Sequence, residues 1–326
     1  MMKAIVVNQY GGPNALIPQK MKAPLPATAE VRLQMRAAGV NFSDVYIRRG
    51  GGSSYGATLP FVAGREGSGI IESFGEEVEG FAIGDRVAFT GVMGSYAEMC
   101  VVPASALIPM PDEMSFEVGA SFPLQGMTAH YLLHEFRHLK AGETVLIHAA
   151  AGGMGLLLCA WAKHLGMRVI GTVSTEEKAA RAKAAGADEI IFYNREDFAP
   201  AVMKSTTVEG AHLIIDGVGK TTFKSDLQCA AIRGDIAVYG GASGPAGSLT
   251  PADLMPRGLS LHSGTLALFT RTREELLLRA DAVLEGWKQG WLDFSPAHIF
   301  DLEDAAKAHE LLESRASSGK IVLRIG

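Results

Sequence analysis

The sequence predicts an α/β fold in which a doubly wound parallel sheet is joined to a second domain that is mostly β. Three observations support this prediction. After Pro123 the chain alternates between strand-like apolar runs and helical segments, which is typical of a parallel sheet wrapped by helices. Before Phe122 it consists of short strand-like runs punctuated by glycine and proline. A glycine-rich turn at residues 149–155 follows one apolar strand and opens an apolar helix.

The second half of the chain contains enough strands for a complete doubly wound sheet. Helices are expected between them, notably at 155–165, closed by Gly166, and at 175–185, closed by Gly186. The six expected strands are 144–149, 168–173, 189–193, 212–216, 235–239 and 259–265.

The first half shows the alternation of a half-buried strand, since Val31, Leu33 and Met35 are separated by polar residues. Further strands are expected at 69–74, 85–89 and 98–102, with turns at the intervening glycines. From about residue 272 the chain returns to helix, strand and helix and ends in a short strand, 320–325. We expect this tail to rejoin the first domain.

Composition excludes several classes of protein. The 326 residues are 48% hydrophobic and 20% charged, with a formal net charge of −5 and no block of like charges, so nucleic acid and anionic membranes are not expected partners. The three cysteines, Cys100, Cys159 and Cys229, are far apart and suit a reducing compartment. Neither a signal peptide nor an apolar run of about 20 residues is apparent. A cytoplasmic protein is therefore expected.

The turn at 149–155 is the principal candidate site. Glycine lets the backbone approach a pyrophosphate, and the following helix offers unpaired N–H groups and its positive dipole end to that anion. The motif is AxxGxxG, with Ala149 at the first glycine position, so its context rather than its letters makes it specific. The alternative is a structural turn without a ligand. The loop residues expected to contact a dinucleotide are Ala150, Gly152, Gly153, Met154 and Gly155.

The end of the second strand of this sheet indicates the choice of cofactor. An NAD-selective site usually places a carboxylate there, whereas this chain continues through Ser174. A 2′-phosphate is then not repelled, and Ser174, Lys178 and Tyr193 could contact it, which favours NADPH. Two alternatives stay open. Ser174 could be the N-cap of a capping box with Glu177 at N3, and the neighbouring glutamates could offset the charge of Lys178.

A literal HExxH motif spans residues 134–138, and His130 extends it by one turn. Two histidines four residues apart would share one helix face, as a zinc protease requires. The helix is expected to run on to a glycine end at 139–142 and to lead into the cofactor strand. Because no third ligand follows at a recognisable spacing, we expect no metal here.

Taken together, these features resemble the zinc-independent quinone oxidoreductases, which are similar to zeta-crystallin and belong to the medium-chain dehydrogenase/reductase superfamily. The resemblance covers essentially the whole chain. Its motifs are AGVNFSDVY at 38–46, GREGSG at 64–69, GDRV at 84–87, PLQGMTA at 123–129, the 149–155 loop, DGVG at 216–219, ESR at 313–315 and Gly319-Lys320.

The resemblance implies a Rossmann dinucleotide-binding domain at 124–267 and a GroES-like catalytic domain at 1–123 and 268–326. Zinc-containing relatives would place ligands near Asn41, at Arg65 and around Ser121, and none of these residues is a zinc ligand. The chain also lacks the four-cysteine cluster of a structural zinc. NADPH is expected across the mouth of the sheet with its nicotinamide facing the first domain. The residues implied around it are Gly217, Gly240, Gly241, Leu266 within the 264–268 loop, and Lys320.

The resemblance places Asn41, Tyr46 and Gln125 beside the nicotinamide, where they would orient the substrate oxygen. Tyr46 could equally be a packed aromatic residue. Arg65 could stabilise a developing oxyanion, although an ion pair with Glu66 or Asp44 is the expected alternative. The glycine-rich stretch 50–56 is expected at the substrate entrance.

Without a metal to stabilise an alkoxide, the substrate should accept hydride readily, as quinones and α,β-unsaturated carbonyls do. The leading hypothesis is an NADPH-dependent quinone reductase, and the runner-up is an alkenal or enone double-bond reductase. A non-enzymatic alternative is an NADPH-binding structural or RNA-interacting protein. The apolar edge at 259–268 is expected to pair two copies in a homodimer.

Overall fold

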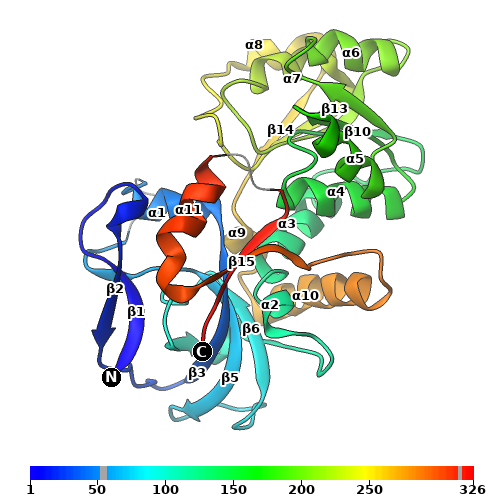
Figure 1. The fold of residues 1–326 in the computed structure, drawn as a ribbon. Coiled ribbons are helices and arrows are strands. Elements are labelled where there is room, and N and C mark those ends of the chain that lie inside the picture. Colours follow the sequence, from blue (N-terminus) through cyan, green and yellow to red (C-terminus); the bar gives the residue numbers. More distant parts are fainter. Residues whose placement is uncertain (52–56, 315–317) are drawn as a thin grey trace. The chain divides into compact units, whose positions relative to one another are not determined.

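The computed structural model describes residues 1–51, 57–314 and 318–326, and the chain forms two compact units (Figure 1). One unit comprises Met1–Leu124, Thr272–Ala280 and Phe294–Gly326. The other comprises Gln125–Arg271 and Asp281–Asp293. Helix α10, Arg273–Lys288, contributes residues to both units.

The second unit contains a six-stranded parallel sheet, as the sequence predicted. The strand order β11-β10-β9-β12-β13-β14 places the first strand in the middle, and the chain then winds outward in both directions. Such a central strand is covered on both faces and therefore reads as an apolar run, and Val145, Leu146 and Ile147 are fully buried. The strands are β9 (Thr144–Ile147), β10 (Arg168–Val173), β11 (Glu189–Phe192), β12 (Ala211–Asp216), β13 (Ala230–Val238) and β14 (Ser260–Ser263).

Helices connect these strands and complete the core. Gly166 and Gly186 adopt left-handed φ values of 78° and 111° just beyond two of the helices, which is the conformation that favours glycine at a helix end. Leu146, Ile170 and Ile214 of the sheet pack in one cluster with Phe198 and Val202. The helices are α3 (Pro123–His134), α4 (Gly153–His164), α5 (Glu176–Ala184), α6 (Phe198–Ser205), α7 (Phe223–Cys229), α8 (Pro251–Leu254) and α9 (Leu266–Phe269), with a 3₁₀ turn at Met255–Arg257.

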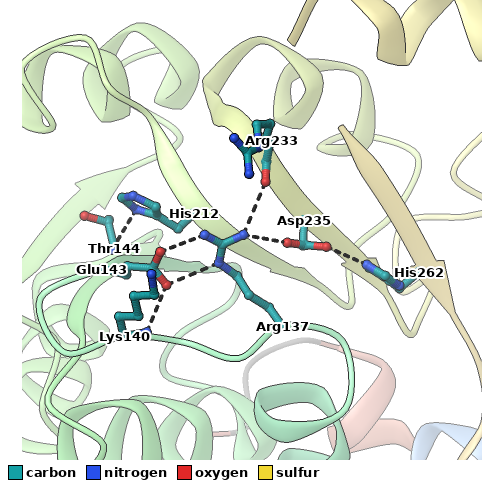
Figure 2. A network of polar contacts seen from close by, with 8 residues as sticks. All are labelled: Arg137, Lys140, Glu143, Thr144, His212, Arg233, Asp235 and His262. Atoms are coloured by element: carbon teal, nitrogen blue, oxygen red, sulfur yellow. Dashed lines mark hydrogen bonds and ion pairs between the residues drawn. The ribbon is translucent and has the colours of Figure 1, made fainter. Parts of the chain in front are cut away.

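Helix α3 ends at His134, earlier than the sequence suggested. The expected helix through residue 139 is therefore wrong, and His134 and His138 do not share a helix face. Figure 2 shows that Arg137, just beyond the end of the helix, lies in a network of polar contacts. Its guanidinium donates to Glu143 at 2.7 Å and to Asp235 at 2.9 Å. Since Glu143 directly precedes β9, this network lies at the amino ends of the strands, away from the glycine loop.

The edge strand β14 is also shorter than expected. The predicted strand at 259–265 is reduced to Ser260–Ser263, and Leu266 begins helix α9. Tyr131 of α3 stacks on Phe269 of α9 with ring centroids 4.2 Å apart, and its hydroxyl donates to the Gly264 carbonyl at 3.3 Å. These contacts favour a short helix where the apolar pattern alone indicated a strand.

The first unit is mostly β, as predicted. A seven-stranded sheet has the order β15-β16-β3-β5-β6-β8, with β7 also paired to β3, and a three-stranded sheet has the order β2-β1-β4. Val31, Leu33 and Met35 are buried, which confirms the alternation along the third strand. The strands are β1 (Met2–Val7), β2 (Leu16–Met21), β3 (Glu30–Val40), β4 (Phe61–Val62), β5 (Glu66–Phe74), β6 (Arg86–Thr90), β7 (Met99–Pro103), β8 (Ile108–Pro109), β15 (Pro296–Asp301) and β16 (Lys320–Arg324).

The tail of the chain joins this sheet. β16 pairs antiparallel with β3 and parallel with β15, so residues near the C-terminus lie beside residues 37–40. This pairing brings Lys320 opposite the start of helix α1. The helices of the unit are α1 (Phe42–Arg48), α2 (Phe116–Gly119) and α11 (Ala305–Glu313), with 3₁₀ turns at Pro13–Ala15, Ala104–Ala106 and Leu302–Asp304.

Candidate active site and cofactor site

The glycine loop connects the carboxyl end of β9 to helix α4. A Cβ on Gly155 would lie 2.4 Å from the Ala149 carbonyl oxygen and 2.6 Å from the Ala150 Cα, so glycine is required for the helix to pack on the strand. A Cβ on Gly152 would meet only the Ala149 oxygen, at 3.3 Å, with no other heavy atom of the described chain within 4 Å. Gly155 therefore serves packing, whereas Gly152 leaves open space over the loop.

Two further loop residues have special environments. Ala149 adopts φ 51°, the left-handed conformation that favours glycine, at the first glycine position of the motif. A Cβ on Gly153 would lie 2.8 Å from Oε1 of Gln125, so the amide of Gln125 lies against the first residue of α4. The structure thus places Gln125 beside the loop.

The start of α4 fits the diphosphate of a dinucleotide. Gly152 is the N-cap and provides no side-chain cap, and the first turn, 153–156, contains no acidic residue. The first N–H groups of a helix lack helical partners and form the positive end of its dipole. Together with the open space over Gly152, this is the backbone environment that binds phosphate groups.

At the end of β10, the structure corrects one expectation. Thr175, not Ser174, is the N-cap of α5, because its hydroxyl accepts the N–H of Lys178 at 3.3 Å. The expected capping box with Ser174 as N-cap is therefore wrong. The Tyr193 N–H donates to the Val173 carbonyl at 3.2 Å, which sets the end of β11 beside the end of β10. Tyr193 is 54% exposed, so its ring is accessible at this end of the sheet.

Three of the predicted glycines near the neighbouring strand ends have close neighbours within the fold. A Cβ on Gly217 would lie 2.6 Å from the Tyr239 hydroxyl, and one on Gly240 would lie 2.9 Å from the Gly217 carbonyl oxygen. A Cβ on Gly241 would lie 3.0 Å from the Gly244 carbonyl oxygen. Leu266 is buried at the start of α9. The backbone contacts account for Gly240 and Gly241 without a ligand, and the cofactor roles of all four residues stay predictions.

Sequence reasoning missed the function of Asp216. Its carboxylate accepts the N–H groups of Val218 and Gly219 at 2.6 and 3.0 Å and the Thr222 hydroxyl at 2.8 Å. It thereby shapes the loop between β12 and α7. The signal was present, because a carboxylate that ends a buried strand and precedes glycine is typical of a turn-forming residue.

In the first unit, Asn41, Glu66 and Lys320 form one buried cluster. The Lys320 ammonium donates to Glu66 at 2.6 Å and to the Asn41 amide oxygen at 2.7 Å, and the Asn41 amide nitrogen donates to Glu66 at 2.8 Å. The other oxygen of Glu66 accepts the Leu124 N–H at 2.7 Å. The expected pairing of Arg65 with Glu66 is therefore wrong, because Lys320 neutralises that carboxylate.

Arg65 contacts the backbone instead. Its guanidinium donates to the Gly91 carbonyl at 2.8 Å, and its Nε is buried with no hydrogen-bond partner within the described residues. No ion pair joins Arg65 to Asp44 in that part of the chain, and the charge of Arg65 only partly opposes the rise that burial causes in the pKa of Asp44. The ring of Tyr46, in helix α1, lies 6.3 Å from the ring of Phe42 between centroids.

Of the stretch 50–56, residues 52–56 lie outside the described residues, as does Arg315 of the ESR motif.

A second buried network extends from Asp44. The Asp44 carboxylate accepts the Asn41 N–H at 2.9 Å and the Tyr96 hydroxyl at 3.3 Å. Tyr96 contacts His309 Nε2 at 3.1 Å, and Arg48 contacts His309 Nδ1 at 2.9 Å. Burial raises the pKa of Asp44 to about 7, and burial together with the Arg48 charge lowers the pKa of His309 to about 3. His309 is therefore neutral, accepting from Arg48 and donating to Tyr96.

The histidines of the HExxH region pack against aromatic rings. His130 and His134 lie 4.6 Å apart between ring centroids, and both contact the Trp161 ring. Within residues 1–51, 57–314 and 318–326, no three His, Cys, Asp or Glu side chains form a group that could hold a metal ion. The described helices also include none with the length and apolarity needed to span a membrane.

Comparisons with known proteins identify the class. Residues 27–112 match the alcohol dehydrogenase GroES-like domain, and residues 153–280 match the family described as zinc-binding dehydrogenase. This combination defines a medium-chain dehydrogenase/reductase with a Rossmann-like sheet and a GroES-like domain. Within that superfamily, the chain belongs to the quinone oxidoreductase family.

Three relatives support the assignment. A quinone oxidoreductase of Pseudomonas aeruginosa is 40% identical, and a 2-haloacrylate reductase of a Burkholderia species is 38% identical, each over 99% of both chains. The crystal structure of the Escherichia coli quinone oxidoreductase, solved as a complex with NADPH, superimposes with a TM-score of 0.95. That comparison covers 99% of both chains at 34% identity.

Proposed function

We propose that this protein is an NADPH-dependent quinone reductase that works without zinc. The structural observation that carries the proposal is the open, uncapped start of α4 behind Gly152, together with the absence of a carboxylate at the end of β10. The first feature suits the diphosphate of a dinucleotide, and the second suits a ribose 2′-phosphate. The NADPH complex of the Escherichia coli relative supports the same cofactor.

NADPH supplies the hydride when it is bound, and the residues of the chain bind and orient the reactants. The loop residues Ala150 to Gly155 would hold the diphosphate through backbone N–H groups. Ser174, Lys178 and Tyr193 would contact the 2′-phosphate. The remaining proposed cofactor residues are Gly217, Gly240 and Gly241 after the ends of strands, Leu266 at the start of α9, and Lys320 on the last strand.

The proposed substrate residues are Asn41, Tyr46, Gln125 and Arg65. Both polar atoms of the Asn41 amide already bond to Glu66 and Lys320, which favours an orienting role over proton transfer. The buried Arg65 Nε–H suits a donor to the oxygen on which negative charge develops. Catalysis then rests on positioning and on exclusion of water.

Quinones fit this donor set because their reduction needs no Lewis acid. The resemblance implies that zinc-containing relatives place ligands near Asn41, at Arg65 and around Ser121, and none of these three residues is a zinc ligand. Conjugation spreads the charge that hydride delivers, so hydrogen-bond donors suffice to stabilise the product. A second candidate function is reduction of a conjugated carbon–carbon double bond, which the full-length similarity to a 2-haloacrylate reductase favours.

We further propose a GroES-like catalytic domain at 1–123 and 268–326 and a cofactor domain at 124–267. A homodimer through the edge at 259–268 is supported by β14, which pairs only with β13 among the described residues, and by the exposure of Leu261 on β14 and Leu268 on α9. A cytoplasmic location is supported by the three cysteines, which are all free and buried. Sedimentation tests the dimer, and a monomer at working concentration would contradict it.

Steady-state assays test the function. Purified protein is given NADPH or NADH with a 1,4-quinone, a 2-haloacrylate or a simple enone, and oxidation of the nicotinamide is followed by absorbance. We expect fastest turnover with NADPH and the quinone. Faster turnover with the haloacrylate or the enone would favour the second function. No oxidation with any acceptor would contradict both.

A further inference from the structure

A buried polar chain lies directly behind the glycine loop. His148 precedes Ala149, and its Nδ1 lies 3.0 Å from the Thr172 hydroxyl while its Nε2 lies 2.8 Å from an Asp226 carboxylate oxygen. His148, Thr172 and Asp226 are 3%, 2% and 0% exposed. The Phe198 ring packs edge-on against the imidazole at 4.7 Å. Water therefore does not screen this contact.

The three polar residues come from three segments that shape the cofactor edge. Thr172 lies near the end of β10, and its carbonyl accepts the N–H of Ala150 in the loop, at 3.1 Å. Asp226 belongs to α7, which follows the turn that Asp216 organises. The imidazole of His148 thus ties β9 to β10 and to α7.

The titratable groups around His148 are all acidic. The titratable groups that face it are the carboxylates of Asp226, in contact, and Asp216, through its field, while Thr172 and Phe198 are neutral. The second oxygen of Asp226 is buried and receives no hydrogen bond from a cationic or neutral donor of the described chain, while the nearby Asp216 carboxylate adds negative charge. A protonated imidazole would donate to Asp226 and offset this negative charge, whereas a neutral one would leave it uncompensated.

Burial alone lowers the pKa of His148, but the charge and hydrogen bond of Asp226 and the charge of Asp216 outweigh it, and the pKa is raised above its ordinary value. Burial raises the pKa of Asp226 to about 6, the histidine opposes that shift, and the neighbouring Asp216 carboxylate adds to it through its charge and a side-chain hydrogen bond. The affinity of the pair for one proton is raised, because a buried carboxylate favours a protonated neighbour. The pair therefore holds one proton at a pH where an exposed histidine has lost it.

We propose that His148 and Asp226 form a proton-linked positioning pair for the dinucleotide, so that the protonated protein binds NADPH more tightly than the deprotonated one. The inference rests on the proposed cofactor. Loss of the proton adds one negative charge behind the loop that receives the diphosphate and weakens the tie between β9 and α7. By linkage, bound NADPH strengthens the hold on the proton, so binding takes up protons from solution.

The test measures the affinity for NADPH and for NADH from pH 7 to pH 9, where the 2′-phosphate, whose second pKa is about 6, is already ionised. Calorimetry in two buffers of different ionisation enthalpy counts the protons exchanged. We expect the dissociation constant of both cofactors to rise by about fivefold or more across this range, with proton uptake on binding.

His148→Gln and Asp226→Asn should each flatten the pH dependence and abolish the proton uptake. His164→Gln is the matched control, because His164 belongs to the same unit but stacks on Trp291 near the end of α4, and it should behave as wild type. A structural defect alone would weaken binding equally at every pH. If one variant does not fold, the other variant and the wild-type proton count still decide.

NADPH binding with no proton uptake, or an unchanged pH dependence in His148→Gln, would overturn this inference alone. No NADPH binding at any pH would overturn the proposed function as well. The two failures are therefore distinguishable.

Discussion

The ammonium of Lys320 lies 2.6 Å from the carboxylate of Glu66, with the two side chains only 4% and 0% exposed. The pair joins β16, at the end of the chain, to β5 of the first half. Asn41 bonds to both partners, so the ion pair also fixes a proposed substrate residue. Its removal should therefore affect both stability and the orientation of Asn41.

Lys320→Met should destabilise the protein strongly, because it leaves the Glu66 carboxylate buried without a counter-charge. We expect the free energy of unfolding to fall by about 3–5 kcal/mol, measured by urea titration. The matched control is the double variant Glu66→Gln/Lys320→Met, which should recover most of the loss. A single variant as stable as wild type would mean that the pair contributes nothing.

Gly155→Ala and Gly152→Ala should separate packing from ligand binding. The first places a methyl group against the backbone of residues 149–150, so unfolding free energy should fall by about 1–3 kcal/mol or more. The second meets only one atom, so its stability should stay near wild type while NADPH affinity drops by about tenfold, or about 1.4 kcal/mol. Thermal unfolding and fluorescence titration measure the two effects. The reverse pattern would refute the assignment.

Ala149→Gly should stabilise the loop. A left-handed conformation destabilises an L-residue by about 1–2 kcal/mol, and glycine relieves this strain. The greater chain entropy of glycine in the unfolded state costs about 0.5–1 kcal/mol. The free energy of unfolding should therefore rise by about 0.5–1 kcal/mol. Ala150→Gly is the control, since Ala150 is buried without a positive φ and should lose stability. Denaturant midpoints compare the two. Equal losses in both variants would show that Ala149 is not strained.

Asp44 should make the protein less stable as pH rises. Burial raises its folded pKa to about 7, so the native state binds a proton that the unfolded state has lost. The stabilisation is complete below the unfolded pKa, about 3.9, and is lost as pH rises through about 7. Between pH 5.5 and pH 8 this amounts to about 2 kcal/mol.

Asp44→Asn should remove that part of the pH dependence, as measured by urea unfolding at the two pH values. The exposed Asp112→Asn is the control and should follow wild type. His309, whose depressed pKa acts in the opposite direction at lower pH, is present in all three proteins and cancels in the comparison. An unchanged slope in Asp44→Asn would contradict a protonated carboxyl.

The sheet and the glycine loop could be predicted from the sequence because both are local. A buried parallel strand reads as a continuous apolar run, and the turn after β9 requires glycine where backbone meets backbone at Gly155. The family followed from short motifs along the whole chain, and the cofactor from the missing carboxylate at Ser174. The end of β10 was predicted as well, but the cap was misplaced by one residue, since Ser174 and Thr175 are both good N-caps.

The sequence alone does not predict side-chain contacts between residues that lie far apart along the chain. Nothing near Glu66 indicates that Lys320 neutralises it, and Arg65 is the more obvious partner by proximity. Just beyond the end of helix α3, Arg137 donates a hydrogen bond to Asp235, which lies about a hundred residues later in the chain. The pairing of His148 with Asp226 likewise requires the folded arrangement of β9 and α7.

The measurement that tests the central claim most directly is a single turnover of protein-bound NADPH by a 1,4-quinone, after treatment of the protein with a metal chelator. Absorbance at the nicotinamide band reports the result. We predict that NADPH binds, that the quinone oxidises it, and that chelation leaves the rate unchanged. Failure of the bound nicotinamide to react with the quinone, or loss of the reaction after chelation, would contradict a zinc-independent NADPH-dependent quinone reductase.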